Sequence, residues 1–175
     1  MTKLLRTTAA DKAGMAPGTL IYIGEPREEP VRITVLRYDA QRFEEYECKG
    51  IGDALELCEP GWVAWLNIDG LQDPAVAGAV GERFHVHPLI LEDILNTEQR
   101  PKLEESDYGF FVLLKMVRAE EDGGRILSEQ VSLVVREGVV VSFQERRGDV
   151  FDAVRERLRT NKGRVRKKAA DYLAY

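Results

Sequence analysis

Two adjacent carboxylates, Glu92 and Asp93, are the side chains of this sequence best suited to metal chemistry. Hard dications such as Mg²⁺ prefer oxygen ligands, keep several of their waters and commonly take one or two carboxylates from a protein. A site built from this pair would be weak, which suits a sensor of an abundant dication. The competing interpretation is a solvated face, because exposed acids on amphipathic helices are commonplace.

The segment 88–96 is predicted to be the helix that positions both carboxylates. Pro88 suits the first residue of a helix, and His87 before it is predicted to bond to the backbone with its ring. Glu92, Asp93 and Asn96 fall on one side of this helix. The opposite flank is apolar and consists of Ile90, Leu91, Ile94 and Leu95.

Signatures of other chemistries are missing from the sequence. There is no GxGxxG loop, no GxxxxGK[ST] loop and no GxSxG elbow, so we predict no catalytic residues and no organic cofactor. Cys48 and Cys58 lack both a CxxC spacing and companion histidines, which argues against zinc. A carboxylate–metal hydrolase built from Asp93, Asp107 and His87 stays open as an alternative, although no spacing favours it.

The composition is that of one globular domain. The 175 residues are 44% hydrophobic, and 25 basic against 30 acidic side chains give a net charge of -5, so we expect no nucleic-acid partner. The basic run from Arg155 to Lys168 could contact phosphates or anionic lipid, but it lacks interleaved aromatics. No apolar run approaches the roughly 18 to 20 residues that cross a bilayer, and we expect this fragment to be soluble.

The hydrophobic pattern divides the chain into three parts: a loose leader at 1–16, a domain at 17–148 and a terminal helical region at 149–175. The predicted fold class is α/β, with a mixed central sheet sandwiched by helices in αβα layers. Asp149 is predicted to cap the terminal helix. Strands are expected at 19–23, 31–38, 62–68, 108–117, 130–135 and 139–143, and helices at 53–58, 74–84 and 88–96.

The stretch from Phe84 to Met116 reads FHVHPLILEDILNTEQRPKLEESDYGFFVLLKM. It resembles the central signature of the cytosolic domain of CorA-type magnesium transporters. Further pieces agree in order along nearly the whole chain: APGTLIYIG from Ala16, WLNIDG from Trp65, SEQVSLVV from Ser128, FQE from Phe143, GDVFDAVRERLR from Gly148, and RVRKKAADYLAY to the end.

The resemblance implies a regulatory domain that senses Mg²⁺, with Co²⁺ as a second possible ion, in a membrane transporter. It implies that Asp93, with Glu92 as accessory, helps to bind a regulatory dication between neighbouring subunits of a homopentamer. It also implies that the terminal region is the start of a long stalk helix. The partner acids of that stalk and the two membrane helices with their Gly-Met-Asn signature would follow Tyr175. We therefore expect a cytoplasmic piece of an inner or plasma membrane protein; the alternative is a stand-alone soluble metal-binding protein or metal-dependent hydrolase.

Overall fold

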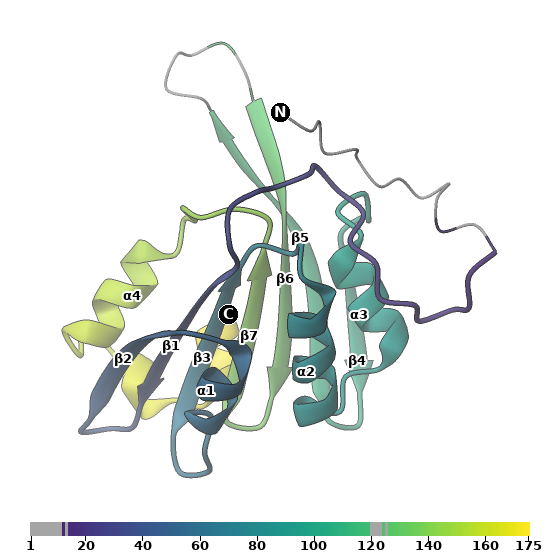
Figure 1. Ribbon diagram of the computed structural model, residues 1–175. Coiled ribbons are helices and arrows are strands. Elements are labelled where there is room, and N and C mark those ends of the chain that lie inside the picture. The colour runs from purple at the N-terminus through teal and green to yellow at the C-terminus, as the bar shows by residue number, and fades with distance from the viewer. Residues whose placement is uncertain (1–11, 13, 120–123, 125) are drawn as a thin grey trace.

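A seven-stranded mixed sheet forms the centre of the computed structural model (Figure 1), which describes residues 12, 14–119, 124 and 126–175. The strand order is β2-β1-β3-β7-β6-β5-β4. The central pair β3 and β7 is parallel, and every other neighbouring pair is antiparallel. The strands are β1 (Arg32–Tyr38), β2 (Phe43–Cys48), β3 (Val63–Asp69), β4 (Lys102–Ser106), β5 (Gly109–Ala119), β6 (Ile126–Arg136) and β7 (Val139–Gln144).

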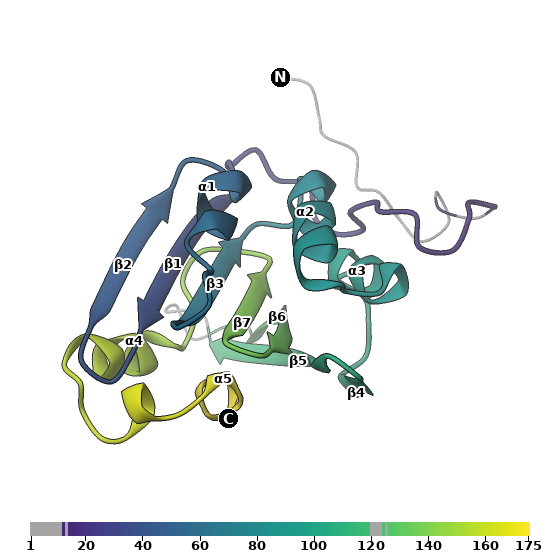
Figure 2. The same ribbon diagram turned by 90° about the horizontal axis from the view of Figure 1, so that it is seen from below.

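Helices cover both faces of this sheet, which confirms the predicted αβα layers. One face carries α1 (Ile51–Glu56), α2 (Pro74–Phe84) and α3 (Pro88–Leu95), and the other carries α4 (Asp152–Arg159), the short 3-10 helix η2 (Val165–Lys167) and α5 (Ala170–Ala174), as Figure 2 shows. Successive side chains of a strand point to opposite faces, so β1 supplies Ile33 and Val35 to one hydrophobic core and Leu36 and Tyr38 to the other.

The two helices that precede β4 begin as predicted. The Asp73 carboxylate accepts a hydrogen bond from Ala75 N at 3.1 Å, and Pro74 takes the first helical position of α2. His87 Nδ1 accepts from Leu89 N at 3.2 Å at the start of α3. Each cap satisfies a backbone donor that the first helical turn leaves without a partner.

Three strand predictions were wrong or missing. The segment 19–23 is not a strand: Ile23 makes a single bridge to Asn96, because the segment runs along α2 and α3 rather than the sheet. The edge strands β2 and β4 were not predicted, since their sequences, FEEYEC and KLEES, are too charged to alternate. Charged edges of this kind discourage pairing with other chains.

The terminal region is helical but interrupted. Residues Asn161 and Gly163 have positive φ angles, of 52° and 83°, and lie between α4 and η2. Phe151 rather than Asp149 is the N-cap of α4, and the Asp149 carboxylate accepts from Phe151 N at 2.8 Å. A long stalk helix following these elements stays a prediction.

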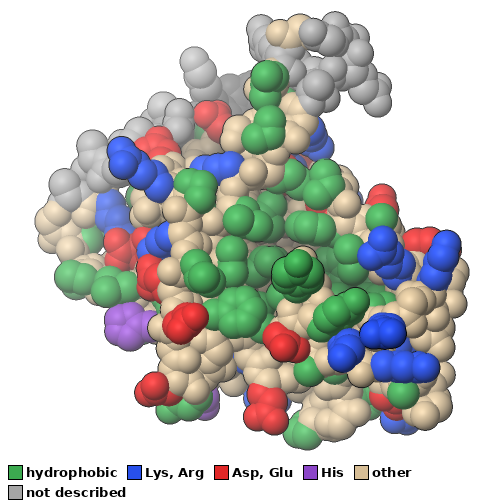
Figure 3. All heavy atoms as spheres, turned by 180° about the vertical axis from the view of Figure 1, so that it is seen from behind, with side chains coloured by type: hydrophobic (Ala, Val, Ile, Leu, Met, Phe, Trp, Pro, Cys, Tyr) green, Lys and Arg blue, Asp and Glu red, His purple; other side chains and the backbone are tan. Residues whose placement is uncertain are grey.

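The face that carries α4 and α5 has a shallow apolar hollow, around which hydrophobic side chains gather in Figure 3. Its lining includes Trp65, Leu133, Val140, Phe151, Val154, Leu173 and Ala174. Within the part of the chain that the structure describes, none of the helices has the length and apolar character needed to cross a membrane.

Candidate metal site on helix α3

Helix α3 carries both predicted metal ligands at the surface of the domain. Its apolar flank is buried against the sheet and α2, as the residues Ile90, Leu91, Ile94 and Leu95 show. Gln130 Nε2 of β6 donates to the backbone oxygens of Asp93 and Ile94, both at 3.2 Å, and fixes the last turn to the sheet. The side chains of Glu92 and Asp93 remain 27% and 18% exposed.

Glu92 is held by the segment that precedes the sheet. Its Oε2 accepts from Gly18 N at 2.6 Å, and its Oε1 lies 2.9 Å from Lys12 Nζ. The hydrogen bond from Lys12, followed by that from Gly18, lowers the pKa of this carboxyl below its ordinary value. Gly18 has φ +81°, and an added Cβ would lie 2.8 Å from Pro88 Cβ. A glycine is therefore what allows the backbone to approach the carboxylate.

Asp93 faces a different partner. Its Oδ2 lies 2.6 Å from Lys102 Nζ of β4, which also contacts the Glu104 carboxylate. Burial lowers the pKa of Lys102, but hydrogen bonds to Asp93 and Glu104 outweigh it, so the pKa is raised. The Lys102 ammonium group thus lies between the carboxylates of Asp93 and Glu104. Carboxylate oxygens are also the ligands that Mg²⁺ prefers.

The two predicted ligands, Glu92 and Asp93, contact different parts of the chain. Glu92 is tied to residues 12 and 18, whereas Asp93 is tied to β4. Among the described residues there is no group of three or more His, Cys, Asp or Glu side chains that could hold a metal ion.

The alternative hydrolase centre is not assembled. His87 and Asp107 line one groove at the end of α2, together with His85, Tyr108 and Arg136, but Asp93 does not line it. The Nδ1 atom of His87 is engaged in capping α3, as predicted for this residue. The three residues that such a centre would need are therefore divided between two places.

Arginines of the basic run make contacts within the domain. Arg159 binds the Glu45 carboxylate through two nitrogens, at 2.8 and 2.7 Å. Arg166 donates to the backbone oxygens of Leu158 and Arg159 and lies over the Phe43 ring. These contacts fasten the terminal helices to β2 rather than presenting the arginines to a phosphate backbone.

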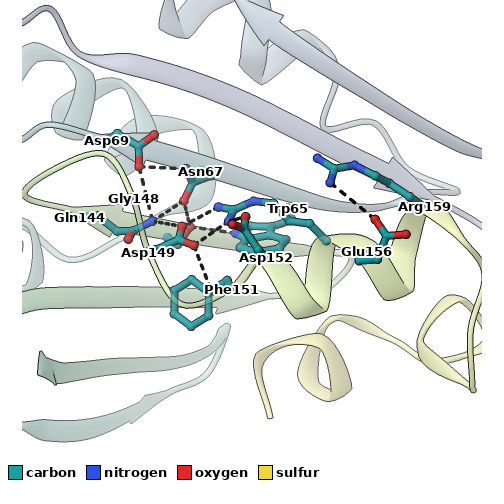
Figure 4. A network of polar contacts seen from close by, with 12 residues as sticks. Trp65, Asn67, Asp69, Gln144, Gly148, Asp149, Phe151, Asp152, Glu156 and Arg159 are labelled. Carbon is teal, nitrogen blue, oxygen red and sulfur yellow. Dashed lines mark hydrogen bonds and ion pairs between the residues drawn. The ribbon is translucent and has the colours of Figure 1, made fainter. Parts of the chain in front are cut away.

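A buried polar network at the end of the parallel pair was not predicted (Figure 4). Ser142 Oγ donates to Asn67 Oδ1 at 2.7 Å and accepts from Trp65 Nε1 at 2.8 Å. Gln144 Nε2 donates to Asn67 Oδ1 and to Asp149 Oδ2, both at 2.8 Å. The available signal was the occurrence of polar residues inside otherwise apolar strands.

The network ends in a buried ion pair. Arg155 Nη2 and Nη1 lie 2.5 and 2.6 Å from the two carboxylate oxygens of Asp149. The Asp149 side chain is 3% exposed, and burial raises its pKa, but the hydrogen bonds from Arg155, Gln144 and Phe151 N outweigh burial and lower the pKa. The guanidinium also lies over the Trp65 ring, 4.8 Å from its centroid.

Comparison with known proteins gives the family of this chain. Residues 62–175 match the family model described as CorA-like Mg²⁺ transporter protein. The chain belongs to the CorA-like Mg²⁺ transporter family. Its sequence is 44% identical over 164 residues to the cobalt/magnesium transport protein CorA of Thermotoga maritima. The aligned region covers 94% of this chain and 46% of that protein. The chain thus spans about half the length of this CorA relative.

Solved structures agree with the fold of this CorA-like domain. The full-length CmaX protein superposes with a TM-score of 0.62 at 18% identity, covering 86% of this chain and 45% of that one. The cytoplasmic domain of ZntB from Vibrio parahaemolyticus gives a TM-score of 0.51 at 16% identity, covering 75% and 51%. The resemblance drawn from 84–116 is therefore confirmed, and the family is one of transporters, not enzymes.

One buried acid of the CorA-like domain predicts a pH-dependent stability. The Glu129 side chain is buried, and its Oε2 has no hydrogen-bond partner among the described residues. Burial, with the nearby charge of Glu145, raises the pKa of this carboxyl. The native state therefore binds this proton more tightly than the unfolded state, so the stability that Glu129 contributes is full at low pH and is lost as pH rises through its native pKa.

Replacing Glu129 with glutamine is expected to raise the free energy of unfolding by about 1 kcal/mol at pH 7, because the variant buries an amide instead of a charge. The gain should shrink as pH falls through the raised native pKa of Glu129 and should be largely gone below the unfolded pKa of glutamate, about 4.3. Urea unfolding at pH 7 and pH 4 measures both values. Glu137→Gln, at an exposed hairpin position, is the matched control; a Glu129→Gln gain that is equal at both pH values would contradict the prediction.

Proposed function

We propose that this chain is the cytosolic regulatory domain of a CorA-type Mg²⁺ transport protein, with Co²⁺ as a possible second ion. In this proposal Asp93, with Glu92 as accessory, supplies part of a weak regulatory dication site between neighbouring subunits of a homopentamer. Family membership supports the transport assignment. One observation supports the site assignment: the Asp93 carboxylate is partly exposed and already binds a cation, the ammonium group of Lys102.

The domain boundaries follow the same proposal. In this proposal residues 17–148 form the α/β domain, and 149–175, whose helices cover one face of its sheet, lead toward a stalk and the membrane helices. Those helices would anchor the domain on the cytoplasmic side of an inner or plasma membrane. The CorA relative is about twice as long as this chain, which supports a larger whole protein.

The proposed mechanism rests on charge at the subunit interface. A dication at Asp93 would bridge carboxylates from two subunits, whereas without it the carboxylates repel at short range and loosen the interface. Ion occupancy would thereby shift the population between closed and open states, by as much as the ion prefers one over the other.

Lys102 gives the site a competitor. Its ammonium group lies 2.6 Å from Asp93 Oδ2 and is shared with the Glu104 carboxylate, so it offsets only part of the Asp93 charge in the absence of a metal ion. A dication must displace this ammonium group, so Mg²⁺ binding to a single chain should be in the millimolar range. The displaced lysine retains the Glu104 carboxylate as its partner.

Titration of the 175-residue chain with Mg²⁺, followed by NMR, tests the assignment. Asp93→Asn is expected to weaken binding at least tenfold, because it removes the charged ligand. Lys102→Gln is expected to tighten it by up to about fivefold, since a partly exposed ion pair contributes up to about 1 kcal/mol. Asp107→Asn, an acid on the β4–β5 turn, is the control.

The whole transport protein provides the functional readout. Asp93→Asn should raise the internal Mg²⁺ concentration at which transport is inhibited, and Lys102→Gln should lower it. Unchanged inhibition in Asp93→Asn would refute the regulatory role of this carboxylate. If the wild-type whole protein showed no Mg²⁺ transport, the proposed transport function would be refuted rather than the assignment of the site.

A further inference from the structure

A buried arginine without a carboxylate partner lies at the end of strand β6. Arg136 is 8% exposed. Its Nε donates to Phe84 O at 3.1 Å, and its Nη1 donates to Val135 O at 3.1 Å. Among the ion pairs of the described residues, none involves Arg136, whereas Arg155, whose side chain is also largely buried, binds Asp149.

The charge of Arg136 must persist in this setting. Burial lowers its pKa, yet a guanidinium does not deprotonate in proteins, so the side chain stays cationic. A charge that is buried without a counter-charge is costly. The carbonyl of Phe84 at the end of α2 offsets part of this cost, because helix carboxyl ends favour cations. Two carbonyls use two of the five guanidinium N–H bonds, and further donors remain.

Arg136 lines a groove of about 370 Å³ between the α2–α3 connection and the β4–β5 turn. This volume lies within the range of small-molecule sites. Apolar walls are provided by Val86, Pro88 and Ile90, and polar groups by His85, His87, Ser106, Asp107 and Tyr108. The groove is separate from the Asp93 carboxylate, which does not line it.

Several polar groups of the groove can donate hydrogen bonds, although the Ser106 hydroxyl already donates to Gly109 O. His87 Nδ1 accepts from Leu89 N, so the neutral ring carries its proton on Nε2 and can donate from there. The rings of His85 and Tyr108 lie 6.0 Å apart, centroid to centroid. Asp107 is the single acid among the lining residues, which keeps the net charge low and suits a compact anion better than a polyanion.

We propose that this groove binds a small oxyanion, a phosphoryl or carboxylate group, which pairs with the Arg136 guanidinium and accepts hydrogen bonds from His85, His87 or Tyr108. Guanidinium groups match the geometry of both oxyanions. The apolar walls leave room for a small organic group beside the oxyanion. This inference does not rest on the proposed regulation by dications.

Inorganic phosphate is the probe, added to the 175-residue chain at constant ionic strength with chloride as the balancing anion. We expect saturable shifts in the backbone NMR signals of His85 and Tyr108, and at least tenfold weaker binding in Arg136→Met. Acetate in a parallel titration distinguishes a carboxylate preference from a phosphate preference. Arg83→Met, which changes an arginine that borders a different groove, should bind phosphate like the wild type.

Two further variants decide the question if Arg136→Met fails to fold. His85→Asn removes the imidazole and introduces asparagine, which tolerates the φ of 52° found at this position. Tyr108→Phe removes one hydroxyl from a side chain that is largely exposed. Each is expected to weaken phosphate binding by about threefold or more. Wild-type affinity in both variants, or shifts confined to other parts of the chain, would overturn the proposal, as would an absence of saturable binding to phosphate and acetate.

Discussion

Replacing Arg155 with methionine is expected to lower the free energy of unfolding by about 3–5 kcal/mol, the range found when one partner of a buried ion pair is removed. Methionine fills much of the space over the Trp65 ring but leaves the Asp149 carboxylate buried without its cation. Gln144 and Phe151 N would still donate to that carboxylate. Their two hydrogen bonds do not replace a guanidinium that contacts both oxygens.

Urea unfolding at pH 7 measures this loss. Arg157→Met is the matched control, because Arg157 lies on the same helix and is exposed, and it should change stability by less than about 0.5 kcal/mol. The pKa of Asp149 is lowered in the native state, so its contribution is present at neutral pH and is lost as pH falls through that pKa. A similar loss in both variants would mean that the pair is not the cause.

The second large effect is expected at Gly109, which opens β5. Its φ is +135°, and an added Cβ would lie 2.1 Å from Val135 O, a backbone atom of the neighbouring strand that cannot rotate away. Gly109→Ala must therefore shift the β5–β6 ladder at Gly109 and Arg136. We expect a loss of about 3 kcal/mol, since backbone strain in such regions costs about 1–3 kcal/mol and the displaced pairing adds to it.

Gly52→Ala is the matched control for Gly109→Ala. Gly52 lies in α1, and an added Cβ there meets nothing within 4 Å. Alanine is favoured over glycine in helices, so this variant should gain up to about 1 kcal/mol. Thermal and urea unfolding of the two variants give the comparison; equal stability of Gly109→Ala and the wild type would show that β5 adjusts without cost.

The sequence predicted those parts of the fold that depend on local patterns. The starts of α2 and α3 were found because Asp73 and His87 stand immediately before a proline and cap the helices themselves. The layered mixed sheet followed from the apolar strands β3, β6 and β7. The edge strands β2 and β4 were missed because their own residues are mostly charged. Each is a strand because it pairs with one neighbour, β2 with β1 and β4 with β5.

The candidate site was predicted in its residues but not in its surroundings. Glu92 and Asp93 lie on α3 as expected, but Gly18 is 74 positions from Glu92, and nothing local in the sequence pairs them. Lys102 was not among the predicted site residues, yet it lies on β4 and binds Asp93. The network of Asn67, Gln144 and Asp149 requires the parallel register of β3 and β7, which only the folded chain provides.

The parallel seam between β3 and β7 also has a consequence for how the chain folds. On one side of it, β1, β2 and β3 are close in sequence, and on the other side β4 to β7 form a continuous antiparallel meander. The seam joins positions as distant as Ala64 and Val139. Loop closure over such a separation is slow compared with hairpin formation. Each half can thus form early from local contacts, and the two become a single cooperative unit when the seam closes.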